Sequence, residues 1–81
     1  MRARIYVHLK PTVLDPQGQT IRRALNSLGH QLITEVRQGK VFDIMVADGL
    51  EREAALRELE EIAREVLSNP VIEEYRVEML D

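Results

Sequence analysis

The stretch DPQGQTIRRALNSLG, residues 15–29, carries the clearest structural signals of this 81-residue sequence. Asp15 can accept hydrogen bonds from the free N–H groups of a first helical turn, and Pro16 suits the first helical position, where its missing N–H is not needed. Gly29 provides the left-handed residue that commonly ends a helix. The stretch therefore predicts an amphipathic helix with one apolar stripe. The members of that stripe are Ile21, Ala24, Leu25 and Leu28.

Alternating apolar and polar residues on both sides of this helix predict strands. One such run covers residues 3–9 and another covers residues 71–80. Residues 32–37 and 41–46 alternate in the same way, and only the glycine-centred link Gln38-Gly39-Lys40 separates them. A short link of this kind between two alternating runs predicts a β-hairpin.

A second helix is expected between the hairpin and the last strand. Asp48 followed by Glu51 has the spacing of a capping box, and Asn69-Pro70 ends the helix. The order β-α-β-β-α-β belongs to the α+β class: a two-layer sandwich whose mainly antiparallel sheet has two helices on one face. We expect one domain over residues 1–81. The apolar face of the second helix consists of Ala55, Leu56, Leu59, Ile62, Ala63 and Val66.

The composition limits how such a small domain can be stabilised. It contains no cysteine, which excludes disulfides and thiolate metal sites. Its two histidines, His8 and His30, lie far apart in the sequence and lack the spacing of helical metal ligands, so we expect no metal site. Oligomerisation is the remaining device by which small domains gain stability. We therefore expect a homo-oligomer.

The charge and hydropathy exclude two classes of partner. A net charge of −3 and an isoelectric point near 5.4 are unlike the basic surface of a nucleic-acid-binding protein. No apolar run approaches the roughly 20 residues that span a bilayer. The amino terminus does not have the pattern of a signal peptide. These observations predict a soluble cytoplasmic protein.

No set of residues in the sequence has the pattern of an active site. Ser27 and Ser68 fall at helix ends, and His30 follows a helix-stopping glycine, so structural roles are favoured for all three. The carboxylates are dispersed among arginines, as on a solvated helix face. We therefore expect no catalytic, cofactor-binding or metal-binding residue in this chain.

Three corners of the chain are candidates for structure or partner contact. The first corner is the start of the first helix, which has a glycine nearby, as phosphate sites do. Asp15 would place a negative charge there, so we interpret this residue as a helix cap and not as part of an anion site. The second places two cations about the predicted hairpin tip and could dock on an acidic surface. A further candidate interface is the sheet face opposite the helices, with Tyr6, His8, Val41 and Met45; scattered exposed apolar residues are the alternative. The corner residues are Asp15, Pro16 and Gly18; Arg37, Gly39 and Lys40; and Asn69 and Pro70.

Several ordered blocks of the sequence resemble the PurS family, the small subunit of phosphoribosylformylglycinamidine (FGAM) synthase. The blocks follow one another with the spacing of that family and span nearly the whole chain. The first block is Leu9-Lys10-Pro11 with Val13-Leu14-Asp15-Pro16-Gln17-Gly18, Ile21, Ala24-Leu25 and Leu28-Gly29; the second is Val36-Arg37 with Gly39-Lys40; the third is Leu67 with Asn69-Pro70-Val71-Ile72-Glu73 and Tyr75.

The resemblance implies a role in an assembly. In that family's complex an ATP-using PurL subunit, which would hold the ATP and magnesium, acts with a PurQ glutaminase that releases ammonia from glutamine. The PurS-like chain, a dimer or a dimer of dimers, bridges the two and supports ammonia transfer, without an active site of its own. The complex is a C–N bond-forming ligase of purine biosynthesis. The alternative is a small-molecule-sensing regulatory dimer of ferredoxin-like type, suggested by fold analogy alone.

Overall fold

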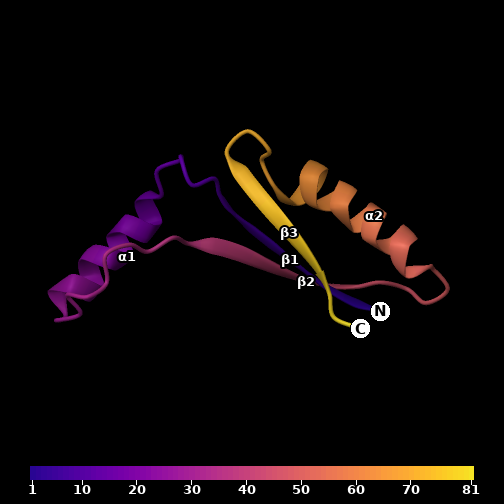
Figure 1. Ribbon diagram of the computed structural model, residues 1–81, viewed down its shortest axis with the longest axis horizontal. Helices are drawn as coiled ribbons and strands as arrows, with labels where there is room; N and C mark the ends of the chain where they lie inside the picture. Colours follow the sequence, from indigo (N-terminus) through magenta and orange to yellow (C-terminus); the bar gives the residue numbers. More distant parts are fainter.

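The computed structural model describes residues 1–81, and its sheet confirms the predicted α+β class. Three strands form one antiparallel sheet in the order β2-β1-β3. In the central strand, Ile5 lies opposite Phe42 on one side and Val77 on the other. Both chain termini lie at the same end of the sheet (Figure 1). The strands are β1 (Arg2–Leu9), β2 (Gly39–Met45) and β3 (Glu73–Met79).

The hydrophobic core lies between this sheet and the second helix. Helix α2 (Arg52–Ile62) and the π-helical turn η1 (Ala63–Leu67) run along one side of the sheet (Figure 1). Ile5 and Val7 of β1 are buried because alternate residues of a strand point to the same face. The cluster consists of Ala3, Ile5, Val7, Leu59 and Ala63, with Phe42, Ile44, Val46, Leu67, Tyr75, Val77 and Met79 packed against it.

The end of the second helix departs from the predicted apolar face. Val66 was expected on that face, but its side chain is 73% exposed, whereas Leu67 packs against the core. The cause is the π-helical turn, which has more residues per turn than an α-helix and so rotates the following residues relative to the stripe. Ser68 Oγ donates a hydrogen bond of 2.7 Å to the carbonyl of Ala63 and closes this turn.

The beginning of the second helix also differs from the prediction. Asp48 does not cap it; Glu51 is the N-cap residue and makes no side-chain capping bond. Gly49 adopts a φ of +98°, so a tight turn separates Asp48 from the first helical residue, Arg52. The predicted capping box is therefore wrong, because this turn carries Asp48 away from the free N–H groups.

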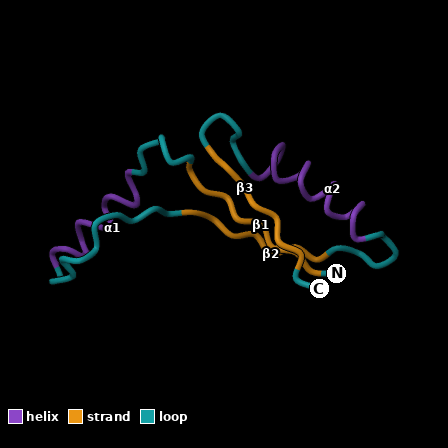
Figure 2. The backbone as a smooth tube through the Cα atoms, in the orientation of Figure 1, coloured by secondary structure: helices purple, strands orange, loops and turns teal.

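The first helix lies apart from the sheet. Helix α1 (Pro16–Ser27) has the predicted start and is followed by Gly29 at a φ of +104°, but it contacts no other helix or strand. Figures 1 and 2 show it extending away from the strands, which gives the chain extents of 51 × 26 × 14 Å. The prediction that two helices cover one face of the sheet is corrected: only α2 does so within the single chain.

Residues 32–37 do not form the predicted strand. They belong to a loop that folds back along α1, where Asn26 Nδ2 donates hydrogen bonds to the carbonyls of His30 and Ile33 at 2.9 and 3.1 Å. Alternation alone does not make a strand, because its backbone groups also need a neighbouring strand. None lies beside this segment, so the sheet has three strands.

The predicted hairpin is absent as well. Gly39 is the first residue of β2, lies opposite His8 of β1 and has no positive φ. The chain therefore runs into β2 without reversing. We call residues 11–38 the arm, and β1, β2, β3, α2 and η1 together the body.

Candidate functional site at the arm–body junction

The three corners singled out in the sequence meet where the arm joins the body. Lys10 N donates to the carbonyl of Ile72 at 2.8 Å, which brings the end of β1 against the turn before β3. Gln38 N donates to Asp15, which brings the start of β2 against the start of α1. We call this region, residues 8–18, 36–40 and 69–73, the junction; it lies between α1 and the upper end of β3 in Figure 1.

Asp15 is the buried polar residue of the junction, with only 4% of its surface exposed. Its Oδ1 accepts a hydrogen bond from Gly18 N at 2.9 Å and its Oδ2 accepts one from Gln38 N at 2.6 Å. These backbone hydrogen bonds, first that of Gln38 and then that of Gly18, together with the charge of Arg37, lower the pKa of Asp15 below its usual value of 3.8. The predicted cap is confirmed, and the same carboxylate also ties the returning chain to the helix start.

Arg37 is a second link across the junction. Its Nη2 donates to the carbonyl of Lys10 at 2.9 Å and to the carbonyl of Val13 at 2.8 Å. The sequence suggested a hairpin tip at this position, but the guanidinium is bound to backbone of the same chain. The side chain therefore joins the segment entering β2 to the segment leaving β1.

Two glycines allow the chain segments of the junction to approach closely. A Cβ at Gly18 would collide with the carbonyl oxygen of Val36, and one at Gly39 would lie 2.8 Å from the carbonyl oxygen of Val7. Both collisions involve backbone atoms, which cannot rotate away. Glycine at these positions is therefore a requirement of packing.

The third corner closes the turn before β3. Asn69 N donates to Glu73 Oε1 at 2.7 Å, and Asn69 Oδ1 accepts from Val71 N at 3.1 Å. Pro70 lies exposed between them. Glu73 Oε2 also lies 3.7 Å from Lys40 Nζ, so this turn is connected to the start of β2 by an ion pair.

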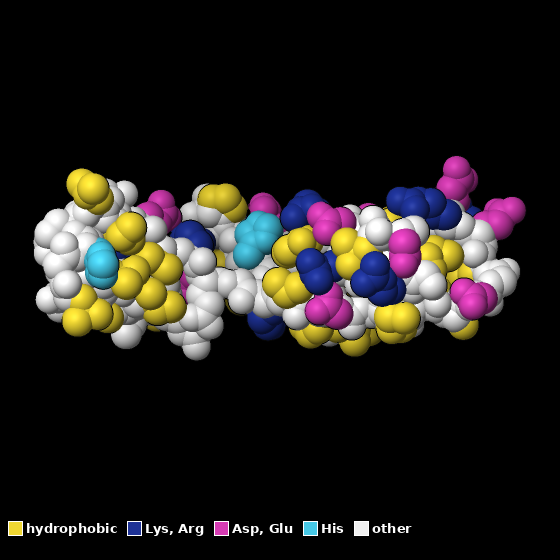
Figure 3. Space-filling view, turned by 90° about the horizontal axis from the view of Figure 1, so that it is seen from below, with side chains coloured by type: hydrophobic (Ala, Val, Ile, Leu, Met, Phe, Trp, Pro, Cys, Tyr) yellow, Lys and Arg dark blue, Asp and Glu magenta, His cyan; other side chains and the backbone are white.

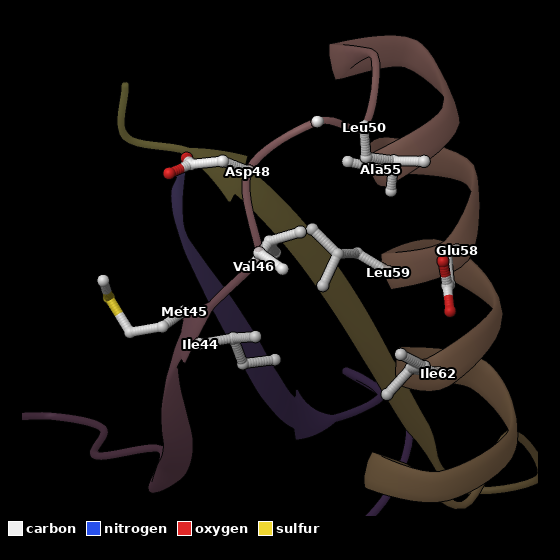
Figure 4. A pocket seen from close by; sticks show the side chains of 11 residues that line it. Ile44, Met45, Val46, Asp48, Leu50, Ala55, Glu58, Leu59 and Ile62 are labelled. Carbon is white, nitrogen blue, oxygen red and sulfur yellow. The ribbon is translucent and has the colours of Figure 1, made fainter.

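A groove that the sequence did not reveal opens between β2 and α2. It has a volume of ≈ 520 Å³, and Figure 4 shows Val46, Leu59 and Ile62 directed into it. β2 is an edge strand, so its outer side carries no further strand. The groove was not predicted from the sequence, because the expected fourth strand and first helix would have covered it. Its lining is Ile44, Met45, Val46, Ala47, Asp48, Gly49, Leu50, Ala55, Glu58, Leu59 and Ile62.

The sheet face opposite α2 carries several ion pairs. Arg4 Nε lies 2.7 Å from Asp43 Oδ1, and this hydrogen bond raises the pKa of Arg4 above its ordinary value. Arg76 stacks over the ring of Tyr6 with its guanidinium carbon 4.1 Å from the ring centroid. Among the residues expected here, Met45 is 75% exposed. The expected residues therefore do lie on this face, which combines charged pairs with exposed apolar side chains, as the sequence pattern indicated.

No three histidine, aspartate or glutamate side chains lie close enough together to hold a metal ion. Every buried side-chain polar atom has a hydrogen-bond partner. No helix has both the length and the apolar character required to cross a membrane. The junction and the groove are suited to shaping the molecule and to contact with other chains.

Comparison with known proteins identifies relatives over nearly the whole chain. The family model named PurS: Phosphoribosylformylglycinamidine (FGAM) synthase matches residues 2–81. The PurS subunit of Mycobacterium leprae is 43% identical over 76 residues, which cover 94% of this chain and 91% of the relative. That of Methanocaldococcus jannaschii is 40% identical over 78 residues, which cover 96% and 93%.

Solved structures agree with this relationship. The crystal structure of Methanocaldococcus jannaschii PurS superimposes with a TM-score of 0.84 at 39% identity, covering 95% of this chain and 92% of that one. A chain in the structure of PurLQS from Thermotoga maritima superimposes with a TM-score of 0.87 at 33% identity, covering 98% and 95%. The resemblance found in the sequence is confirmed, and this chain belongs to the PurS family of FGAM synthase subunits.

Proposed function

We propose that this chain is the non-catalytic assembly subunit of an FGAM synthase in purine biosynthesis, acting as a single PurS-like domain. The observation that carries the proposal is the full-length similarity to a chain of the Thermotoga maritima PurLQS structure. By that similarity its partners are a PurL-type synthetase and a PurQ-type glutaminase. The absence of a clustered set of catalytic side chains fits a subunit that works through its surfaces.

The chemistry of the complex gives a bridging subunit a physical purpose. A glutaminase releases ammonia, and a synthetase uses it as a nucleophile with ATP and magnesium held in its own site. Ammonia that escapes into water becomes protonated and loses its nucleophilic electron pair, so the two sites must communicate through a protected path. We propose that this chain holds the two larger subunits in register for that transfer. The eight corner residues then act by shaping the junction that presents the arm.

We also propose that the chain works as a homo-oligomer, a dimer or a dimer of dimers. Only 8 of its 81 residues are buried, so the core of the single chain is small. None of the large apolar side chains of the arm is among them. Leu28 and Leu32 of the arm are 76% and 94% exposed, and yellow side chains gather over the arm in Figure 3. The body offers an apolar groove and the unpaired edge of β2. A second copy would cover these surfaces reciprocally.

Reconstitution tests the proposed function directly. The two larger subunits from the same source are assayed for FGAM formation with glutamine and, separately, with ammonium salts as the nitrogen donor. We expect this chain to raise glutamine-dependent turnover and to have no activity alone. We expect ammonia-dependent turnover to respond much less, because dissolved ammonia needs no path between subunits. Full glutamine-dependent turnover by the two larger subunits without this chain would contradict the proposal.

A further inference from the structure

The arm is joined to the body only at the junction, because α1 contacts no helix or strand of the body. Two passes of the chain make the connection: residues 10–15 leave the body and residues 36–39 return to it. Figure 2 shows them as two separate loops, one between β1 and α1 and the other between α1 and β2. Two single passes without cross-links would leave the arm free to swing.

Each pass supplies one charged side chain that binds the backbone of the other pass. Asp15, on the outgoing pass, accepts the hydrogen bond of Gln38 N at 2.6 Å. Arg37, on the returning pass, donates from Nη2 to the carbonyls of Lys10 and Val13 at 2.9 and 2.8 Å. Hydrogen bonds with one charged partner are shorter and roughly twice as strong as those between neutral groups. The two links are reciprocal, so together they resist rotation of one pass about the other.

A third contact supports the same geometry without adding charge. The space at Gly18 is filled by the carbonyl of Val36, so the first turn of α1 rests directly on the returning pass. The second oxygen of Asp15 is occupied by Gly18 N at 2.9 Å, which locks the carboxylate to the helix start. The direction of α1 is thereby coupled to the direction in which the chain enters β2.

We propose that Asp15 and Arg37 are positioning residues that fix the angle between arm and body, and that assembly of the enzyme complex requires this angle. The second half of this inference rests on the proposed function. Neither residue touches a substrate or a reacting atom. Their action on turnover passes through the arm, whose apolar residues must meet other chains at fixed places.

The body core is independent of these two side chains. Its buried residues, such as Ile5 and Leu59, belong to β1, α2 and their neighbours and not to the arm. We call the hydrogen bonds of Asp15 with Gln38 and of Arg37 with Lys10 and Val13 the clamp. Loss of the clamp therefore leaves a folded body, and a change in arm angle can be measured separately from unfolding. Arg23, an exposed arginine of α1, provides a matched control for loss of a positive charge on the arm.

The angle is measured as a distance distribution in the full-length chain. The sequence has no cysteine, so Ser27→Cys on α1 and Glu61→Cys on α2 introduce two selective attachment sites for spin labels. Labelled chain is diluted with unlabelled chain so that the distances are those within one copy. We expect a narrow distribution with Asp15 and Arg37 present, and a broadened one in Arg37→Gln and in Asp15→Asn. Arg23→Gln leaves the distribution narrow.

The clamp acts as one unit, so the double variant is no broader than either single variant. In the reconstituted complex, Arg37→Gln raises the concentration of this chain needed for half-maximal glutamine-dependent turnover severalfold, because the two hydrogen bonds that it removes are exposed to solvent. Arg37→Lys keeps the charge but has a shorter side chain and lacks the planar Nη2 group that donates to both carbonyls, so it should behave like Arg37→Gln.

Two results would overturn the inference. Distance distributions unchanged in both single variants would show that the arm angle does not depend on these residues. Broadened distributions with unchanged glutamine-dependent turnover would show that assembly does not need the angle. If the unaltered chain fails to support turnover at all, the proposed function fails, while the distance measurement on the isolated chain still decides the clamp.

Discussion

The arm and the body have similar amphipathic patterns, but the apolar residues are buried in the body and exposed in the arm. In the body, Ile5 and Val7 are excluded from water by α2 and η1. In the arm, the only buried residues are Asp15 and Gly18, both at the junction, and Leu32 is 94% exposed. The comparison teaches that an apolar stripe indicates a need for a covering surface. It does not indicate that the same chain supplies that surface.

The two regions are therefore stabilised by different forces. Each large apolar side chain of the body contributes roughly 1.5–3 kcal/mol when fully buried. The arm depends on a helix cap, on Arg37 and on short-range hydrogen bonds such as those of Asn26. A substitution should consequently act on folding in the body and on association or orientation in the arm.

The largest effect is expected from the body. Leu59→Ala removes a side chain that is 3% exposed and leaves a cavity against β1, which typically destabilises a protein by about 2–5 kcal/mol. For a small domain this is a large part of the total stability. Urea unfolding followed by circular dichroism measures the change. A loss below about 1 kcal/mol would mean that the core of the body is not where the structure places it.

The next largest effect is expected from a substitution in the arm, which should change self-association and not folding. Leu32→Glu should leave the unfolding of highly diluted chain nearly unchanged, because the side chain is exposed. It should weaken self-association by more than tenfold, since a charge would have to be buried in the proposed contact with a second copy. Sedimentation velocity over a concentration series measures this, with Thr34→Glu, an exposed residue of the same loop, as control. Equal association of the two variants would remove Leu32 from the contact.

The smallest effect is expected from a change of pH, which tests the hydrogen bonds that Asp15 makes at the junction. Because the pKa of Asp15 in the folded chain lies below its ordinary value of 3.8, its contribution is complete above that value. It is lost as the pH falls through the lowered pKa of the folded state. Protection of the Gly18 and Gln38 amides, measured relative to their intrinsic exchange rates, should fall in that acid range, and Asp15→Asn should abolish this additional dependence. A carboxyl carbon titration centred at or above 3.8 would contradict the assigned hydrogen bonds.

Local signals in the sequence predicted local structure well. Asp15, Pro16 and Gly29 define α1 through interactions within a few residues, and alternation identified the buried side of β1. Residues 32–37 were mistaken for a strand because alternation does not reveal whether a neighbouring strand exists. The π-helical turn at Ala63–Leu67 was missed because Val66 and Leu67 are both apolar, so the sequence does not show which of them faces the core.

The residues of the candidate site could be predicted from the sequence, but the fact that they meet in one place could not. Its three corners were found from turn chemistry and family resemblance, yet their meeting depends on where β1, β2 and β3 end relative to one another. The link from Arg37 to two carbonyls has no sequence signal, because backbone acceptors are present at every position. The groove beside β2 was hidden by the strand that was expected to fill it.

The free edge of β2 has a consequence for how the chain behaves before it finds its partners. An unpaired strand edge is a template for any other extended chain, and open-ended strand addition leads to aggregation. Lys40 and Asp43 place charges on β2 that oppose this, but Val41 is 56% exposed between them. A second copy that covers this edge, as proposed above, would close it against such addition. Self-association would then protect the chain from aggregation as well as cover its exposed apolar side chains.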